Sequence, residues 1–193
     1  MLTEPGKLPD GFILVRDFLS PAEEAGLIPV LAALRFGEVR MHGVVAKRRV
    51  AQFGWHYAFE SFRLTPAPPL PAQLEPIRRR AAEFAGVSAD EFSETLVTEY
   101  PPGAGIGWHR DAPPFGIVAG ISLAAESRMR FQRGSGADRV TAAVILPRRS
   151  LYLLTGPARS EWQHTLPPVR ELRYSITFRT LKPTRPGLLS RNP

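Results

Sequence analysis

The chain has 193 residues, of which 44% are hydrophobic and 22% are charged. This length and balance fit one globular domain with a full core and exclude a disordered chain. Because the chain contains no cysteine, disulfides, thiolate metal ligands and a thiol nucleophile are excluded. No apolar run reaches the roughly 18 residues that span a bilayer, and the N-terminus lacks a signal-peptide pattern. We therefore expect a cytoplasmic protein without membrane association.

The net charge of +7 is distributed unevenly. Residues 1–96 carry 11 basic and 12 acidic side chains, whereas residues 97–193 carry 14 basic and 6 acidic side chains. An excess of this sign favours an anionic partner, either nucleic acid or a small dicarboxylate or phosphate. Solubility alone also accounts for it, so the charge leaves the partner open.

The first half of the chain predicts a strand, helices and a β-rich segment. Residues 12–15 read as a short strand, and Ser20 begins a helix that runs to about Leu34. Ser20 and Glu23 form the pattern of a capping box. The composition of residues 45–58 is β-rich around a glycine kink.

A proline-rich loop and a second helix follow. We predict a loop over 64–71 and a helix over about 72–86, with a single helical turn at 88–91. One face of the longer helix carries apolar residues at helical spacing, namely Leu74, Ile77, Ala81 and Phe84.

From residue 94 onward, short β segments recur between Gly, Pro and Asn/Asp/Ser positions. This spacing favours an antiparallel sandwich or barrel over alternating βαβ units. We predict an α+β, mainly β, single domain with helices and a basic β ribbon before a β-sandwich. The segments are 94–100, 117–124, 128–133, 139–146, 150–155 and 172–181.

The stretch YPPGAGIGWHRD at residues 100–111 contains a possible metal motif. In a strand, His109 and Asp111 would point the same way, and His164 is the only histidine in the β-rich half that could join them. Two histidines and one carboxylate with open positions are typical of non-heme Fe(II) oxygenases. The alternative is a turn histidine whose hydrogen bond goes to Asp111.

Residues 172–179 alternate between apolar and polar side chains. One face of this predicted strand would carry four polar residues, and solvent exposure is the simplest explanation of such a face. If the face points inward instead, its two guanidinium groups need anionic partners, and a dicarboxylate cosubstrate would be one. The four residues are Arg173, Ser175, Thr177 and Arg179.

Together these motifs resemble the AlkB family of Fe(II)- and 2-oxoglutarate-dependent dioxygenases. The family pattern is Asn-x-Tyr, a glycine-rich stretch into HxD, a distant His, and RxNxTxR. The resemblance covers roughly residues 45–181. The corresponding residues are Thr98 and Tyr100, then His109 and Asp111, then His164, then Arg173, Ser175, Thr177 and Arg179.

The resemblance implies a double-stranded β-helix, or jelly-roll, core over about 94–181, preceded by helices and a nucleotide-recognition lid over 1–93 and followed by a tail over 182–193. It implies Fe(II), 2-oxoglutarate and O₂ as cofactor and cosubstrates. The implied iron ligands are His109, Asp111 and His164. The implied 2-oxoglutarate site comprises Thr98, Tyr100, Arg173, Ser175 and Arg179, with Arg179 near the metal-side carboxylate or paired with Asp111.

Three positions depart from the family pattern. Thr98 and Ser175 stand where the family has Asn, so each keeps a hydrogen-bonding group with a shorter reach. Pro113 stands two residues after the HxD aspartate, where DNA-repair members have a polar or acidic residue that helps read the base. Base recognition would therefore need other residues.

In the family, the segment that corresponds to residues 40–63 forms the lid. Basic and aromatic side chains together suit phosphate contact and base stacking, although an aromatic row at spacing two is also typical of a sheet core. His42 and His56 are expected in the lid or core rather than at the metal. The candidate substrate residues are Lys47, Arg48, Arg49, Phe53, Trp55 and Tyr57.

Two other arginine clusters need no functional explanation. Residues 78–80 fit a solvated helix face, with nucleic-acid contact as the alternative, and residues 148–149 fit a turn.

The resemblance implies oxidative dealkylation of N-alkylated bases in DNA or RNA, with an N-methyl group leaving as formaldehyde. Two alternatives stay open: a hydroxylase or demethylase of a protein side chain or a modified tRNA nucleoside, and a non-catalytic basic nucleic-acid-binding module. We expect a monomer whose partners are alkylated DNA or RNA and 2-oxoglutarate.

Overall fold

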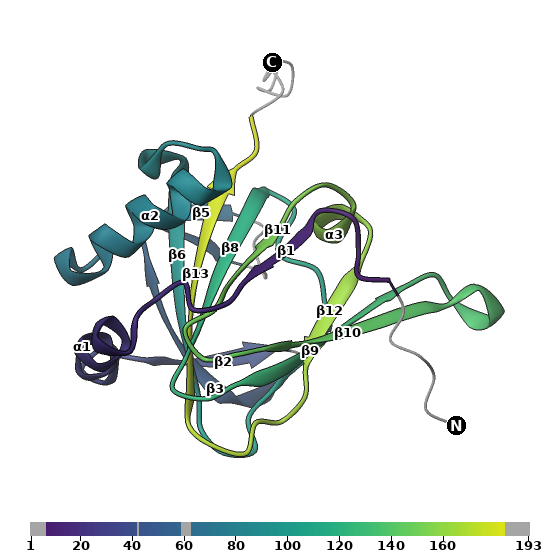
Figure 1. Cartoon of the computed structure of the whole chain (residues 1–193), viewed down its shortest axis with the longest axis horizontal. Coiled ribbons are helices and arrows are strands. Elements are labelled where there is room, and N and C mark those ends of the chain that lie inside the picture. Colours follow the sequence, from purple (N-terminus) through teal and green to yellow (C-terminus); the bar gives the residue numbers. More distant parts are fainter. Residues whose placement is uncertain (1–6, 42, 59–62, 184–193) are drawn as a thin grey trace.

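Three layers make up the fold: two helices, a seven-stranded sheet and a four-stranded sheet (Figure 1). The computed structural model describes residues 7–41, 43–58 and 63–183. All neighbouring strands pair antiparallel, so the prediction of a mainly β fold with an antiparallel sandwich is confirmed. None of the helices in these ranges has the length and hydrophobicity that a bilayer span needs.

The larger sheet has the strand order β1-β11-β8-β13-β6-β3-β2. Its central strand β13 pairs with β6 on one side and β8 on the other, which joins residues far apart in the chain. The strands are β1 (Phe12–Val15), β2 (Gly37–Met41), β3 (Val44–Phe53), β6 (Phe92–Tyr100), β8 (Phe115–Leu123), β11 (Leu151–Leu154) and β13 (Arg173–Leu181).

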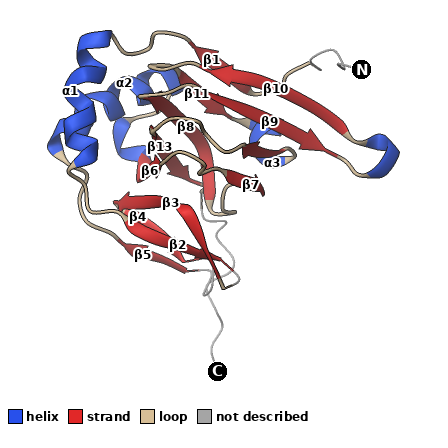
Figure 2. Cartoon of the chain, turned by 90° about the horizontal axis from the view of Figure 1, so that it is seen from below, coloured by secondary structure: helices blue, strands red, loops and turns tan. Residues whose placement is uncertain are grey.

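The smaller sheet has the order β10-β9-β12-β7, so β7 lies at an edge. The β9–β10 hairpin extends away from the rest of the molecule (Figure 1). A separate hairpin, β4–β5, lies with β2 and β3 on one side of the sandwich (Figure 2). The strands are β7 (Ile106–His109), β9 (Ser127–Arg133), β10 (Val140–Leu146), β12 (Gln163–Leu166), β4 (Trp55–Ala58) and β5 (Arg63–Pro66).

The helices begin where the capping signals predict. Ser20 accepts a hydrogen bond from the Glu23 amide and Glu23 bonds back, which confirms the capping box of α1 (Pro21–Ala32). A 3₁₀ turn, Ala72–Leu74, leads into α2 (Glu75–Ala85), which ends at Gly86 in the left-handed region. The single turn at Ala89–Glu91 is confirmed.

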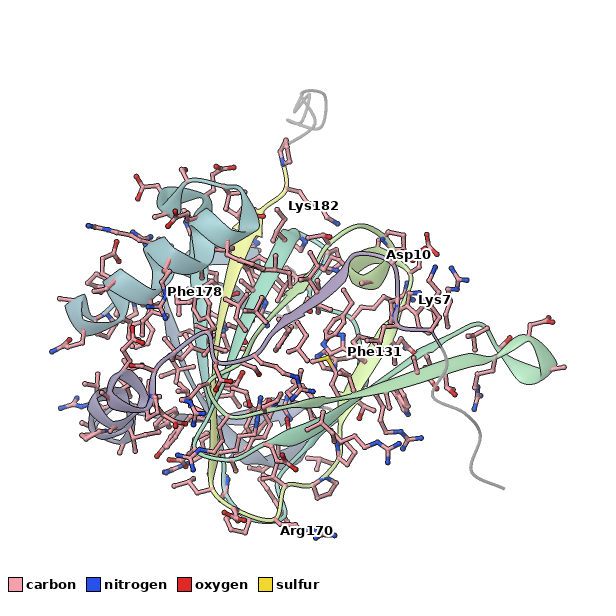
Figure 3. All side chains as sticks on the ribbon, viewed as in Figure 1. Lys7, Asp10, Phe131, Arg170, Phe178 and Lys182 are labelled. Atoms are coloured by element: carbon pink, nitrogen blue, oxygen red, sulfur yellow. The ribbon has the colours of Figure 1, made fainter. Side chains whose placement is uncertain are left out.

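Two apolar clusters cover the two faces of the larger sheet. One lies under α1 and α2 and contains Phe178, whereas the other fills the space between the sheets and contains Phe131 (Figure 3). The predicted apolar face of α2 is wrong at Phe84, which is 41% exposed. Ala82 packs into the core instead. The face of α2 that contacts the sheet is therefore rotated slightly around the helix axis from the predicted face.

Several short elements escaped prediction. From the sequence we predict no strand at β2 or β12 and no helix at α3 (Gly156–Ser160). The first part of the predicted loop at 64–71 forms β5. Each of these elements has only four or five residues. Whether such a short segment forms a strand or a helix depends on contacts with parts of the chain that are distant in sequence.

The arginine clusters outside the site are bound to carboxylates and backbone. Arg80 contacts Glu23, the Phe18 carbonyl and the Phe18 ring, and Arg78 pairs with Glu75. Arg148 pairs with Glu24, which is 2% exposed. Arg78 and Arg80 are thus engaged in ion pairs rather than freely solvated, and the predicted turn at 148–149 anchors α1 to the sandwich.

Candidate active site

The small sheet brings the predicted metal ligands together. His109 is the last residue of β7 and lies directly opposite His164 of β12, with 4.3 Å between the ring centroids. The Nε2 atom of His164 is 3.7 Å from Oδ2 of Asp111. The expectation of one strand carrying both His109 and Asp111 is wrong, because β7 ends at His109 and Asp111 follows in a loop.

The atoms around this cluster suit a cation. Oδ2 of Asp111 and Nδ1 of His164 are buried without a hydrogen-bond partner. His109 can donate from Nδ1 to the Gly107 carbonyl at 2.9 Å, which leaves Nε2 with a free lone pair as in many metal-bound histidines. Within the described ranges, however, no three His or carboxylate side chains already converge as ligands of one ion. Metal binding by these three residues stays a prediction that requires side-chain adjustment.

Local electrostatics hold these side chains in their ligating forms. Burial lowers the pKa of His164 to about 3, with a contribution from His109, and burial also lowers the pKa of His109. Burial would raise the pKa of Asp111, but Arg179 and the two histidines outweigh it and hold the pKa below its usual range. At neutral pH the cluster therefore has two neutral imidazoles and one carboxylate, the states that bind metal.

Arg179 is fully engaged with two carboxylates. It donates from Nε to Oδ1 of Asp111 at 2.8 Å and from Nη1 to Oε2 of Glu94 at 2.7 Å, while Nη2 lies 2.7 Å from the same Asp111 oxygen. Glu94 is 2% exposed and lies opposite Arg179 in the β6–β13 register. Burial would lower the pKa of Arg179, but Glu94 and Asp111 together raise it. Of the two possibilities for Arg179, the structure has the pair with Asp111.

Arg173 is buried without an anionic partner. Its side chain is fully buried, and its Nη1 and Nη2 atoms have no hydrogen-bond partner. The Nε atom donates to Oγ of Ser122 at 3.1 Å, and the guanidinium carbon lies 5.1 Å from the centroid of the Tyr100 ring. Burial accordingly lowers the pKa of Arg173. A buried guanidinium with two free nitrogens fits a carboxylate ligand.

Thr98 and Ser175 lie beside this arginine. They are paired across β6 and β13, two residues along each strand from the Tyr100–Arg173 pair, and both are 4% exposed. Strand alternation therefore turns the polar face of β13 inward, between the two sheets, so the alternative of a solvent-exposed face is excluded.

Further residues of the site carried no sequence signal. The pKa of Tyr152 is raised to about 12 by burial and by the charge of Asp111. Its ring lies so close to Gly120 that any side chain there would collide with it. Arg159 of α3 donates to the carbonyls of Ala112 and Phe115 at 2.7 and 2.8 Å. Arg159 thus fixes the loop that follows Asp111.

The basic cluster of the predicted lid divides between two faces of β3. Arg49 pairs with Glu99 at 2.6 Å and lies over the Phe36 ring, on the helix side of the sheet. Arg48 points to the opposite face, where burial lowers its pKa and where its charge, after the larger effect of burial, lowers the pKa of His109. The prediction of one phosphate-binding cluster is wrong for Arg49, because alternation along a strand separates neighbouring side chains. Lys47 is exposed.

The predicted aromatic row is also divided. Gly54 has φ +77° and separates β3 from β4, so Phe53 and Trp55 belong to different strands. Phe53 packs against the core beneath the helices, Trp55 is 37% exposed, and Tyr57 is buried against Phe115 beyond the HxD motif. A shared stacking face is therefore wrong, and Tyr57 is the member nearest the candidate site. His56 lies in β4, whereas His42 is outside the described residues.

Comparisons with known proteins agree with this geometry. The profile of the 2OG-Fe(II) oxygenase superfamily matches residues 11–179. Mouse DNA oxidative demethylase ALKBH2 is 31% identical over 76% of this chain and 66% of its own length. Mouse tRNA (carboxymethyluridine(34)-5-O)-methyltransferase ALKBH8 is 29% identical over 83% of this chain, which spans about a quarter of that protein.

A solved structure shows the same fold. The structure of OsALKBH1 superposes with a TM-score of 0.68 at 16% identity, and the match covers 92% of this chain and 100% of that one. The predicted AlkB-like fold is thereby confirmed. Since the family profile covers most of the sequence, the chain belongs to the 2OG-Fe(II) oxygenase superfamily, and its relatives include AlkB homologues.

Proposed function

We propose that this protein is an Fe(II)- and 2-oxoglutarate-dependent dioxygenase that removes alkyl groups from N-alkylated bases in DNA or RNA. The observation that carries the oxygenase assignment is the buried Arg173, whose two unpartnered nitrogens lie between the same sheets as the His109, His164 and Asp111 cluster. A cation site and an anion site in one interior are what an iron-bound dicarboxylate requires.

Each residue has a defined task in this proposal. His109, Asp111 and His164 would hold Fe(II), which with O₂ and 2-oxoglutarate supplies the oxidation of a substrate C–H bond. Arg173 would bind the far carboxylate of 2-oxoglutarate, with Tyr100 against its guanidinium. Thr98 and Ser175 supply hydroxyl groups to the same wall.

The net reaction balances in two steps. An N-methyl group, O₂ and 2-oxoglutarate give an N-hydroxymethyl group, succinate and CO₂. The C–N bond then breaks with its electron pair staying on nitrogen, and formaldehyde leaves. The hydroxyl proton goes to the base nitrogen of a neutral adduct, or to solvent when the alkylated base is a cation such as 1-methyladenine or 3-methylcytosine.

Nucleic acid is favoured as the substrate by charge and by the relatives. Arg48 faces the candidate site from β3, and within the described residues it has no hydrogen bond or ion pair. An unpaired guanidinium at this position would attract a phosphate. The relative ALKBH2 is named a DNA oxidative demethylase, which is the same chemistry.

A modified tRNA nucleoside is the second candidate. Pro113 is exposed just after the HxD motif and offers no side-chain donor or acceptor for a damaged base. The similarity to ALKBH8, which is named for its action on tRNA, favours the same substrate class. The basic charge disfavours a protein side chain.

The test measures succinate and formaldehyde from anaerobically iron-loaded protein that receives 2-oxoglutarate and then air. Single-stranded oligonucleotides carry 1-methyladenine or 3-methylcytosine, and total tRNA and a methylated peptide serve as parallel substrates. Formaldehyde in step with succinate, only with the methylated oligonucleotides, supports the first proposal. Succinate with tRNA alone selects the second candidate, and no succinate under any condition supports a non-catalytic binding module.

A further inference from the structure

The smaller sheet has an outer face that the candidate active site does not use. Strand alternation turns His109, His164 and Phe131 toward the interior, so Trp108, Arg130 and Thr165 point outward. Arg128 lies on the same outer side as Arg130, two residues earlier on β9. Thr165 is covered, with its hydroxyl bonded to the Ile106 carbonyl, so we call the surface defined by Trp108, Arg128 and Arg130 the outer face.

The outer face is cationic without compensation. None of the four strands β7, β9, β10 and β12 contains an Asp or Glu. Arg128 and Arg130 are exposed, and across the described ranges neither forms an ion pair with a carboxylate. By contrast, Arg133 at the end of the same strand pairs with Glu161 at 2.6 Å. Two guanidinium groups without a carboxylate partner, about 7 Å apart along one strand, suit successive phosphates better than a single anion.

An aromatic ring completes this surface. Trp108 is 37% exposed, and the guanidinium of Arg130 lies 5.6 Å from its ring centroid. A flat sheet that presents an aromatic ring beside arginines is suited to stacking bases while the backbone follows the cations.

The position of Trp108 connects the outer face to the candidate active site. β7 is the edge strand of its sheet, and Trp108 and His109 are consecutive residues that point to opposite sides. His109 is half-exposed at the end of this strand. A chain that stacks on Trp108 therefore needs to turn over only one strand edge to reach the ligand cluster.

We propose that the outer face binds single-stranded nucleic acid, with a base stacked on Trp108 and phosphates on Arg128 and Arg130, and leads the strand over the β7 edge to His109. This inference rests on the proposed function for its substrate class. The outer face would be a second binding surface for single-stranded nucleic acid, separate from the lid expected at residues 40–63.

The test is fluorescence anisotropy with labelled, unmodified 12-nucleotide oligo(dT) and oligo(U). The double variant Arg128→Gln/Arg130→Gln should bind about tenfold more weakly at 0.1 M salt, and the slope of log affinity against log salt should shrink by about 1.4, or about 0.7 for each lost phosphate contact. Trp108→Leu should weaken binding about tenfold without changing that slope. Oligo(dT) and oligo(U) distinguish DNA from RNA as the source of the strand.

The matched control removes the same charge elsewhere. Arg16 and Arg35 are exposed and unpaired within the described residues, so Arg16→Gln/Arg35→Gln lowers the net charge equally. Equal losses of affinity in the two double variants, or no oligonucleotide binding by the wild type, would overturn the proposal that the outer face binds nucleic acid. A dimer that Trp108→Leu dissociates, without strand binding, would assign the surface to a second copy and likewise overturn it.

Formaldehyde assays separate this inference from the proposed function. If methylated 12-mers give formaldehyde and Arg128→Gln/Arg130→Gln leaves their KM unchanged, the proposed function stands and the outer face is wrong. If unmodified strands bind through these residues but no methylated strand is turned over, the outer face stands and the proposed substrate is wrong. Unchanged melting temperatures of the variants confirm that they fold.

Discussion

The two ends of β13 each bury an arginine, but the two arginines lie in opposite electrostatic environments. At one end, Arg179 uses every nitrogen group of its guanidinium on Asp111 and Glu94. At the other end, Arg173 is fully buried, with two nitrogens that have no partner. A buried pair whose charges balance supports the folded state, whereas a buried charge without a partner is destabilising until a ligand arrives. The difference separates a residue that positions a metal ligand from one that is open to an anion.

The largest expected effect concerns the ligand cluster that Arg179 supports through Asp111. His109→Ala should abolish succinate release, because it removes a ligand candidate, while the free energy of unfolding changes by only about 1 kcal/mol at this half-exposed position. Succinate assays and urea unfolding measure the two quantities. Activity close to that of the wild type would remove His109 from the metal site.

Arg179→Met should lower the free energy of unfolding, which tests the difference between the two arginines. It leaves Asp111 and Glu94 as buried carboxylates without their cation, which costs about 3–5 kcal/mol. Urea unfolding without ligands measures this change, and Arg173→Met is the matched control because it removes another interior guanidinium from the same strand. We expect the control to be neutral or stabilising, and equal destabilisation of both variants would contradict the distinction.

Arg173→Met should instead affect the cosubstrate. Loss of a charged, hydrogen-bonded carboxylate contact corresponds to roughly 2.7 kcal/mol, or about a hundredfold increase in the KM for 2-oxoglutarate. Steady-state succinate formation measures the KM, and protection against urea by 2-oxoglutarate provides a readout without turnover. An unchanged KM with normal protection would show that the cosubstrate does not bind at Arg173.

Glu94→Gln should give the smallest effect. The amide keeps a hydrogen-bond acceptor for Arg179 but removes the charge, so Asp111 is held less firmly and metal affinity should fall about tenfold. Binding of Mn²⁺ in the absence of substrate measures this affinity, while the KM for 2-oxoglutarate should stay constant. A raised KM with unchanged Mn²⁺ affinity would instead place Glu94 in the cosubstrate site.

Local sequence predicted the parts of the site that depend on residue type and period. The HxD motif, the distant His164 and the alternation from Arg173 to Arg179 were sufficient to identify the family and a strand with one polar face, although the direction of that face stayed open. Alternation of side chains is a property of the backbone itself, so it can be read without knowing the neighbouring strands. The capping box at Ser20 is equally local.

Partners across the fold could not be read in this way. Glu94 and Arg179 are 85 residues apart in the sequence, and Arg49 and Glu99 meet only because β3 pairs with β6. Nothing local distinguishes Arg48, which faces the candidate site, from Arg49, which lies on the other face of β3 and pairs with Glu99. Gly54 likewise interrupts the aromatic row through a backbone conformation whose consequence depends on the β4–β5 hairpin.

The sequence by itself thus determined which chemical groups the interior of this protein contains, because motif and period are encoded along the chain. The tertiary structure decided which of those groups are already paired, because strand register brings each charge to its partner or leaves it without one. That assignment distinguishes Arg179 from Arg173, two residues that the alternation of side chains alone presents as equivalent ends of one strand.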